Sequence, residues 1–527
     1  MGDDGDLPRP AREDRTGAAA DRRRPATAAQ LAPQGVDRTP RAVAQRPWAR
    51  DARRGNRGVT KTVAVIGGGL AGLAAALRLG DAGYRPIVIE SRKMLGGRAT
   101  SVVDPRNNET IDNCQHVLLG CCTNLIDLYD RLGVLDHIQW HRTLYWTRDH
   151  GEISVMKAGW LPAPLHMSGS FMRMKLFDSR QRLHIARAMW RIIRMGPGGR
   201  HAWAERTFAD FLDSCGQPEA VVNQFWDVIV TSACNIGVHR VGAAYALQVF
   251  GQGFLEHRWS YTMGLATVPL VNLYDTAAAV LRDMGGTVML GTSARSISFD
   301  GRQVTGVVTA NGFVDAAAVV SAVPFDRLHK LVSTTVREAD TRLRNLGRFE
   351  VSPILGVHLW FDRPVMTLPH LVLVDAGVHW LFNKGTDSDG RQHVHAVISA
   401  ADDWMGLPEQ QIAEKVVADI HRALPASVGI EPIQVRSIKE KRATFAATPG
   451  ADAFRPTAGP APADGPAIDN LYLAGDWCLT GWPATMEGAV RSGYAAAAEI
   501  CRKDGIESVG VVDDVPASWL ARLLRGK

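Results

Sequence analysis

The sequence predicts an α/β fold, and three observations support this prediction. Residues 61–66 form a β-branched run of the kind buried in parallel sheets, and a glycine-rich turn and a helical pattern over 73–80 follow at once. A second apolar run, 86–89, ends at an acidic residue. Far along the chain, 470–474 has the pattern of a third strand. Strand, glycine turn and helix in this order are typical of a Rossmann-like domain, which we expect here in several separate pieces.

Length and composition limit the class of protein. The chain has 527 residues, of which 46% are hydrophobic and 22% charged, so we expect two or three structural units with sizeable cores. No stretch approaches the ~18 consecutive apolar residues of a membrane-spanning helix, and no secretory signal begins at Met1. Seven scattered cysteines include no C-x-x-C pair, so neither a zinc site nor a disulfide framework is indicated. We therefore expect a cytoplasmic protein with reduced thiols and no bound metal.

Residues 1–58 form a separate tail rich in Arg, Pro and Ala. Up to residue 60 the chain has 13 Arg and 8 Asp or Glu, so most of the net charge of +6 lies there. Few aromatic or periodic apolar residues accompany these charges, so the segment cannot bury enough surface to offset its ordering entropy. We expect a disordered, solvated tail and no specific nucleic-acid partner.

Each glycine of the first turn has its own physical purpose. Gly67 permits the tight turn, Gly69 lets the backbone approach a pyrophosphate, and Gly72 allows close packing of helix and strand. The N-terminus of the helix offers free N–H groups to the phosphates. Glu90 stands 18 residues beyond Gly72, at the end of the second strand, where it can accept hydrogen bonds from a ribose. These residues predict a dinucleotide site.

A second glycine-rich segment follows this strand and ends in Gly96, Gly97 and Arg98. The two glycines expose backbone amides, and the arginine adds a fixed positive fork, a combination that suits a diphosphate. In this segment the sequence resembles the FAD-binding amine oxidase and carotenoid desaturase superfamily, in which a G-G-R motif at this place belongs to flavin binding. The resemblance implies FAD as the cofactor.

The C-terminal region resembles the second flavin segment of that superfamily. The strand at 470–474 runs into Gly475 and Asp476, and Pro483 can begin a helix after a short turn. The resemblance implies that Asp476 contacts the ribityl and pyrophosphate groups and that the start of the helix faces the N1/C2=O edge of the flavin. It also places the backbone near Ala294, among short predicted strands, against the adenine. The predicted flavin site comprises Gly67, Gly69, Leu70, Ala71, Gly72, Glu90, Ser91, Gly97, Arg98, Ala294, Gly475, Asp476, Thr485 and Met486.

We expect the cofactor domain to be discontinuous, with a substrate domain inserted in it. No second G-x-G-x-x-G follows a strand, so a dedicated NAD(P)H domain is not indicated. The inserted parts are predicted to be α+β, with a helical, membrane-facing region. We assign 59–110, 265–335 and 445–505 to the FAD-binding domain, 111–264 and 336–444 to the substrate-binding and helical region, and 506–527 to a C-terminal tail.

Residues 111–125 and 475–489 closely resemble the hydroxysqualene dehydroxylases, also called squalene-associated FAD-dependent desaturases. The likeness extends over residues 62–498. Two residues depart from the pattern: Cys114 stands where a D-N-G-Q-H motif has glycine, and Cys478 where a hydroxyl or acidic residue is usual. A side chain at position 114 would be strained if the turn there had a positive φ. The resemblance implies reductive removal of an allylic hydroxyl from a C30 isoprenoid to give squalene, as in squalene and hopanoid biosynthesis.

Three residues are candidates for the chemistry. His116 can donate a proton near neutral pH, and Gln115 beside it can orient a hydroxyl group. Glu487 is the next candidate for the acid. Both acid candidates have a structural alternative, because a histidine beside a turn can serve packing and an acid in the first turn of a helix is favoured by the helix dipole.

The substrate region is predicted from composition. Residues 140–260 and 340–440 are rich in Trp, Met, Phe and Leu, which suit a long apolar ligand but serve equally for core packing. The candidate tunnel residues are Tyr245, Phe250, Phe254 and Trp259.

The segment Arg180–Arg194 has the pattern of an amphipathic helix. At ~100° per residue, its apolar side chains fall on one half and four arginines form a stripe on the other. We expect either a surface helix over a core or a peripheral contact with the inner face of the cell membrane. The apolar half comprises Leu183, Ile185, Ala186, Met189, Trp190, Ile192 and Ile193, and the stripe Arg180, Arg187, Arg191 and Arg194.

Other functions fit the same motifs. A carotenoid (phytoene-type) desaturase would use this fold in the oxidising direction, and an amine or porphyrinogen oxidase would act on other substrates. A non-catalytic isoprenoid-lipid escort protein would keep the dinucleotide fold without the cofactor. The intact glycines together with Glu90, Arg98 and Asp476 favour a flavoprotein. The sequence identifies no electron donor.

Overall fold

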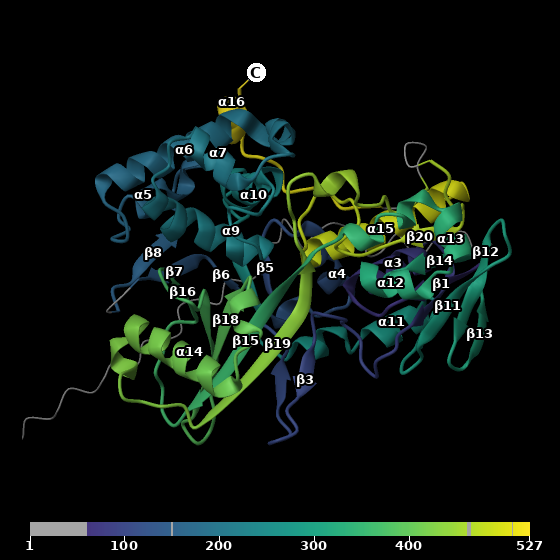
Figure 1. Cartoon of the computed structure of the whole chain (residues 1–527), viewed down its shortest axis with the longest axis horizontal. Coiled ribbons are helices and arrows are strands. Elements are labelled where there is room, and N and C mark those ends of the chain that lie inside the picture. Colours follow the sequence, from purple (N-terminus) through teal and green to yellow (C-terminus); the bar gives the residue numbers. More distant parts are fainter. Residues whose placement is uncertain (1–60, 149–150, 461–464, 509, 527) are drawn as a thin grey trace, which may run out of the picture. The chain divides into compact units, whose positions relative to one another are not determined.

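A five-stranded parallel sheet forms the centre of the Rossmann-like part in this computed structural model (Figure 1). Every neighbouring pair of its strands is parallel. The strands come from stretches of the chain that are far apart in sequence, so the complete sheet forms only when these stretches come together. In spatial order they are β10 (Thr287–Met289), β2 (Arg85–Ile89), β1 (Thr62–Ile66), β14 (Ala318–Ser321) and β20 (Leu471–Leu473).

The side chains of this sheet alternate between two layers, as the period of a β-strand requires. Val63 and Val65 of β1 belong to a core shared with helices, whereas Ala64 and Ile66 belong to a core shared with a small antiparallel sheet. The helices are α3 (Leu70–Asp81), α4 (Thr123–Arg131), α11 (Ala277–Asp283) and α15 (Met486–Lys503). The small sheet consists of β11 (Ala294–Phe299), β12 (Val304–Thr309) and β13 (Gly312–Asp315).

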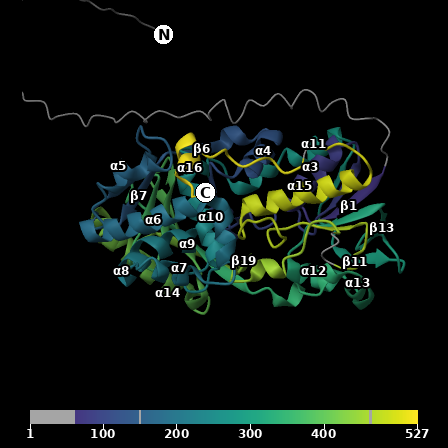
Figure 2. The same cartoon turned by 90° about the horizontal axis from the view of Figure 1, so that it is seen from above.

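Helices α3 and α15 lie side by side, as Figure 2 shows. Small residues allow this approach, since Ala74 and Ala75 of α3 are completely buried. A Cβ at Gly493 would lie 2.2 Å from the carbonyl oxygen of Ala71, so only glycine fits there. The start of α3 is thereby held against the middle of α15.

A seven-stranded sheet carries most of the inserted part. One face packs on α14 (Glu409–Ala423) through Leu355 and Val357, and Phe382 and Val397 lie in a separate apolar cluster. In spatial order the strands are β19 (Gln434–Phe445), β15 (Val351–Phe361), β18 (Gln392–Ser399), β17 (Trp380–Thr386), β16 (His370–Leu373), β7 (Thr143–Thr147) and β8 (Ser154–Lys157).

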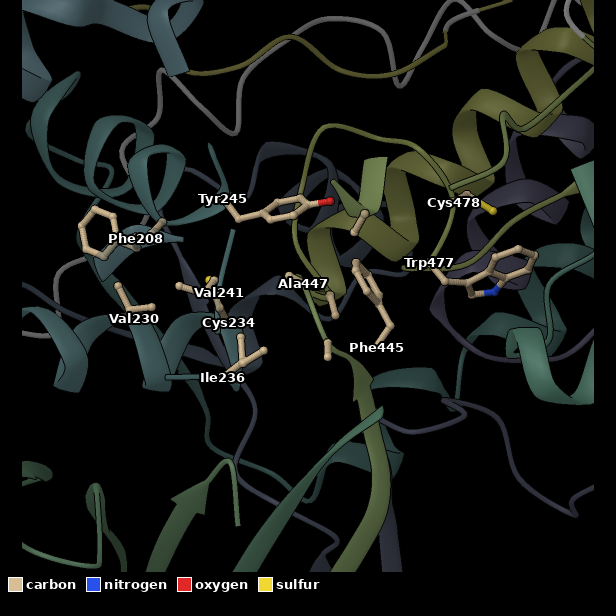
Figure 3. Close-up of a cluster of buried hydrophobic side chains, with 14 of the residues drawn as sticks. Phe208, Val230, Cys234, Ile236, Val241, Tyr245, Phe445, Ala447, Trp477 and Cys478 are labelled. Atoms are coloured by element: carbon tan, nitrogen blue, oxygen red, sulfur yellow. The ribbon is translucent and has the colours of Figure 1, made fainter. Parts of the chain in front are cut away.

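A helical part packs against both sheets through one large apolar core. The buried cluster in Figure 3 runs from Phe208 through Tyr245 to Phe445 and Trp477. It therefore connects the helices to the end of β19 and to the segment after β20. The helices are α5 (Ser168–Phe171), α6 (Ser179–Gly199), α7 (Phe208–Ser214), α8 (Glu219–Val221), α9 (Asp227–Cys234) and α10 (Ala243–Phe250), followed by a π-helical turn η6 (Gly251–Leu255).

Helix α6 is amphipathic, but its buried face differs from the predicted one. Ile185, Ala188 and Ile192 are buried, at the spacing of three and four residues that one helix face requires. Leu183 and Trp190 are 51% and 48% exposed, so the apolar half of the helix is divided between core and surface.

Arg191 does not belong to an outward stripe on α6. It donates to the carbonyl and hydroxyl oxygens of Ser214 at 3.0 and 2.7 Å and lies over the rings of Trp203 and Phe211. The predicted arginine stripe is therefore wrong at this position. Helical periodicity places a residue on a side of the helix, but the neighbouring α7 decides whether that side faces solvent.

The other elements complete the described chain, which covers residues 61–148, 151–460, 465–508 and 510–526. The predicted tail over 1–58 lies outside these residues. Within them, no helix is both long and apolar enough to span a bilayer. The remaining strands are β3 (Ser101–Val103), β4 (Thr110–Asp112), β5 (Val117–Leu119), β6 (Ile138–His141) and β9 (Met263–Ala266). The remaining helices are α12 (Phe325–Leu331), α13 (Thr334–Ala339) and α16 (Trp519–Leu524).

Candidate active site

A cavity of about 910 Å³ collects the residues that the sequence analysis singled out. All the residues predicted to bind FAD line it, with the exception of Gly72. The three candidates for the chemistry, Gln115, His116 and Glu487, line it as well. A Cβ at Gly72 would lie 1.9 Å from the carbonyl oxygen of Gly67, so Gly72 serves the packing of α3 against β1. Much of the remaining lining is apolar, although polar side chains such as Ser232, Asn235 and Ser399 also belong to it. The apolar lining includes Trp146, Val228, Ile229, Val249, Phe254, Met263, Ile354, Trp380, Phe382 and Val397.

Two glycine turns form a cradle at one end of the cavity. Gly69 is the N-cap of α3, with extended backbone angles. Its backbone lies against the second turn, where a Cβ at Gly97 would be 3.0 Å from the Cα of Gly69. The N–H of Gly96 donates to the carbonyl oxygen of Gly68 at 2.9 Å. Side chains at these positions would fill the space beside the start of α3, so the cradle fits a group that needs close approach to the backbone.

Glu90 stands at the end of β2 and is 7% exposed. One carboxylate oxygen accepts from the N–H of Gly68 at 2.7 Å, and the other accepts from the N–H of Arg92 at 2.7 Å and the hydroxyl of Ser91 at 3.2 Å. A carboxylate has about four acceptor positions, so these three donors orient Glu90 and leave one position for a ribose hydroxyl. The carboxylate is thus held in place by the glycine turn itself.

Arg98 and Asp476 form an ion pair, although they are far apart in the sequence. Arg98 also donates to the carbonyl oxygen of Ala443 at 2.8 Å. The free guanidinium that the sequence analysis expected beside a diphosphate is therefore used partly within the protein. Two further cations, Arg327 and Lys330, line the cavity and were not predicted, because nothing in the sequence around α12 shows that it meets the glycine turns.

Arg455 supports the segment after β20. No local sequence pattern predicts this role of Arg455. Its fully buried guanidinium donates to the carbonyl oxygens of Asp476 and Cys478 and to the carboxylate of Asp452, the first at 3.0 Å and the last at 2.9 Å. Buried carbonyl groups need such partners, because an unpaired one is costly. Arg455 thus holds the loop that presents Asp476 to the cavity.

Gln115 and His116 lie on the cavity wall beside Lys384, which the sequence analysis missed. The ammonium group of Lys384, on β17, donates to Gln115 Oε1 and to Asp112 Oδ2, both at 3.1 Å. Burial lowers the pKa of His116 to about 4, against the opposing effect of Asp112. His116 is therefore a neutral imidazole at pH 7, and its ordinary pKa overstates its ability to donate a proton there.

The two cysteines that depart from the family pattern are unreactive thiols. Cys114 does not have a positive φ, so the strain considered for its side chain does not arise. Burial raises the pKa of the Cys114 thiol to about 12 and raises that of Cys478 further. Both thiols are protonated at neutral pH.

Glu487 is completely buried and is fully used as a hydrogen-bond acceptor. It accepts from the backbone and side-chain amides of Asn124 at 3.2 and 2.9 Å and from the N–H of Leu125 at 2.8 Å. It also pairs with Arg491 at 2.7 Å. Four donors around one carboxyl group suit a carboxylate, so Glu487 clamps the first turn of α4 and is a poor proton donor.

Three of the four candidate tunnel residues lie away from the cavity. Phe254 lines it, but Tyr245 donates to Asp452 at 2.6 Å and Phe250 packs against Trp226 with ring centroids 4.8 Å apart. Trp259 packs on Trp140. This part of the prediction was wrong, because adjacent residues of one helix point in different directions: on α10, Val249 faces the cavity and Phe250 the core.

Comparisons with known proteins identify the family to which this chain belongs. Residues 70–501 match the family described as flavin containing amine oxidoreductase. The 15-cis-phytoene desaturase of Synechococcus elongatus is 26% identical over 469 residues, covering 84% of this chain and 97% of that protein. The zeta-carotene desaturase of Zea mays is 25% identical over 495 residues, covering 84% of each chain.

Solved structures share the fold at lower identity. Putrescine oxidase with bound putrescine has a TM-score of 0.63 and 17% identity, over 84% of this chain and 99% of the other. An oxidoreductase from Methanosarcina mazei has the same TM-score and identity, over 84% and 100%. The family match covers most of the sequence and includes α3, all but the last two residues of α15, and nearly all of the cavity lining. This chain therefore belongs to the flavin-containing amine oxidoreductase family, and its cofactor is FAD.

Proposed function

We propose that this FAD-dependent oxidoreductase removes an allylic hydroxyl group from hydroxysqualene and so produces squalene. One observation carries the proposal: the same cavity of about 910 Å³ is lined by the glycine cradle, by many apolar side chains, and by the polar side chains of Gln115 and His116. An apolar chain with one hydroxyl group matches that lining. The relatives described above are desaturases of phytoene and zeta-carotene, which supports an isoprenoid as the ligand.

The proposed reaction needs a proton, a hydride and a dry site. The allylic C–O bond breaks as its oxygen takes a proton and leaves as water, and the resulting cation is delocalised over the double bond. FAD bound in its reduced form would supply the hydride of the new C–H bond and would be oxidised in doing so. Apolar side chains such as Phe382 and Val397 exclude water that would recapture the cation. Lys384 fixes the amide oxygen of Gln115, so the NH2 group of Gln115 is the donor that can hold the substrate hydroxyl.

We expect hydroxyl removal to become faster as the pH falls. With a pKa of about 4, His116 is protonated in only about one molecule in a thousand at pH 7. If His116 supplies the proton, the single-turnover rate rises about tenfold for each pH unit between pH 7 and pH 5. The measurement is the anaerobic re-oxidation of photoreduced protein by hydroxysqualene, followed by the flavin absorbance.

Two variants separate the acid from the group that orients the substrate. His116→Ala is expected to slow the step by about 100-fold or more and to abolish its pH dependence, with an unchanged flavin spectrum. Lys384→Met, which releases Gln115, is expected to slow the step while the pH dependence stays. A flat pH profile in the unaltered protein would exclude His116 as the acid.

A carotenoid-type desaturase is the second candidate, and the relatives favour it. Parallel anaerobic incubations with hydroxysqualene, phytoene and a simple amine distinguish the two, with products identified by mass. Formation of squalene by the reduced protein would support the dehydroxylase. Desaturation of phytoene by the oxidised protein, with reduction of its flavin, would establish the desaturase instead.

We also propose a peripheral contact between α6 and an anionic membrane. Leu183 and Trp190 are exposed large apolar side chains, and Arg187 and Arg194 are exposed on the same helix. Apolar residues flanked by arginines are typical of helices that lie in the membrane interface. An insoluble isoprenoid would reach the protein from such a surface.

Sedimentation with anionic liposomes tests this contact. Binding is expected to weaken with salt and to fall about tenfold or more in a double variant, Arg187→Glu with Arg194→Glu. The matched control is the double variant Arg295→Glu with Arg302→Glu, at two exposed arginines of the β11–β13 sheet region. It changes the net charge by the same amount as the α6 double variant. Equal loss in both double variants would show that only net charge matters and would remove α6 as the contact.

A further inference from the structure

A second, smaller cavity of about 40 Å³ shares a wall with the large one. Gln248 of α10 and Gln252 of the π-helical turn η6 line both cavities. The outer walls of the small cavity come from α6 and α16, through residues such as Ile192 and Ala521. Two side chains therefore separate the inner, apolar cavity from a space beneath the surface helices.

The dividing wall is polar, and Arg200, Glu256 and Arg525 line the small cavity together with its apolar residues. Gln248 donates to Gln252 Oε1 at 2.7 Å, and Gln252 donates to Asp514 Oδ2 at 2.8 Å. Gln248 is 4% exposed, and its own amide oxygen has no hydrogen-bond partner. Buried acceptors are normally satisfied, so the closed arrangement is held by few bonds and carries an unfavourable group.

The small cavity lies beneath an apolar part of the surface. Trp190 of α6 is 48% exposed, and Trp519 and Leu523 of α16 are 62% and 69% exposed. The N–H of Gly526, two residues after the end of α16, donates to the carbonyl oxygen of Arg194 on α6 at 2.8 Å. Exposed large apolar residues concentrated on two adjacent helices are typical of a surface that contacts a membrane or another protein.

We propose that the small cavity is the outer half of the passage through which the apolar ligand enters, and that Gln248 and Gln252 form its gate. The proposal rests on the proposed function only in taking the ligand to be a long apolar molecule. The apolar surface of α6 and α16 delivers the ligand, the gate opens by side-chain rotation, and the inner cavity binds it. Entry and exit then share one barrier, which is independent of the affinity of the inner cavity.

Stopped-flow binding of cis-parinaric acid, a fluorescent polyene, tests the passage in the FAD-loaded full chain. Gly251 lines only the small cavity and has open space around a built Cβ, whereas Gly253, two residues later, lines only the large cavity. Gly251→Leu is expected to slow association and dissociation about equally and to leave Kd unchanged. Gly253→Leu is expected to raise Kd, because its side chain would occupy part of the large cavity. Gln252→Leu, which removes both hydrogen bonds of the gate, is expected to speed both rates about tenfold.

Each other result overturns the passage. Unchanged rates in Gly251→Leu would mean that the ligand enters elsewhere, and a changed Kd in that variant would make the small cavity a binding subsite. Circular dichroism and flavin content confirm that each variant is folded. Because the probe is not converted to product, failure of the protein to act on hydroxysqualene would overturn the proposed function and leave this measurement intact.

Discussion

Gly69→Val is expected to give a folded protein that no longer holds FAD. Gly69 has φ −80° and ψ −177°, which any residue can adopt, and a built Cβ lies no closer than 3.6 Å to its neighbours. A valine therefore fits the protein but fills the cradle between the two glycine turns. The glycine pattern predicts that the backbone approaches the pyrophosphate there, so we expect FAD affinity to fall by about 100-fold or more.

The ratio of flavin absorbance to protein absorbance after purification measures this loss. Loss of a bound cofactor lowers thermal stability by itself, so the variant is compared with the unaltered protein after FAD has been removed. Gly72→Val is the contrasting variant: its Cβ would meet the carbonyl oxygen of Gly67 at 1.9 Å, so we expect it not to fold. Full flavin occupancy in Gly69→Val would contradict the placement of the cofactor.

Glu487→Ala is expected to lower the free energy of unfolding by about 3–5 kcal/mol. The change leaves the buried Arg491 without one of its partners and leaves the N–H groups of Asn124 and Leu125 unsatisfied at the start of α4. Urea unfolding of the FAD-free protein at pH 7 measures the effect without a contribution from cofactor binding.

Glu487→Gln distinguishes this clamp from a catalytic acid. Glutamine keeps the volume but offers one acceptor oxygen, and its NH2 group faces other donors, so a loss of about 1–3 kcal/mol is expected. A proton donor would behave differently: the variant would be as stable as the unaltered protein and would lose only turnover. That result would restore Glu487 as the acid.

The dinucleotide-binding turn could be predicted because its interactions are local. Strand, glycines, helix and Glu90 follow one another within 30 residues, and each glycine has a backbone requirement that few other residues meet. The structure closes this unit with the hydrogen bond from Gly68 to Glu90. Local geometry and residue type together are enough to specify such a turn.

The surroundings of the chemical residues could not be predicted in the same way. Lys384 forms a hydrogen bond with Gln115, which is 269 residues away in the sequence. Glu487 accepts a hydrogen bond from Leu125, which is 362 residues away. No pattern in one sequence relates such positions, because the contacts exist only after the sheets and helices have packed. The lowered pKa of His116 has the same origin, since burial is a property of the assembled protein.

By itself, the sequence determined that this chain binds a dinucleotide on an α/β framework and that Arg180–Arg194 is an amphipathic helix. Only the tertiary structure decided which apolar side chains form the core and which line the cavity, as Phe250 and Val249 show on one helix. It also decided that Arg98 pairs with Asp476 and that Arg191 bonds to Ser214 of α7. The physical reason is that periodicity and glycine geometry act over a few residues, whereas burial and ion pairing depend on neighbours that the chain brings together from far apart.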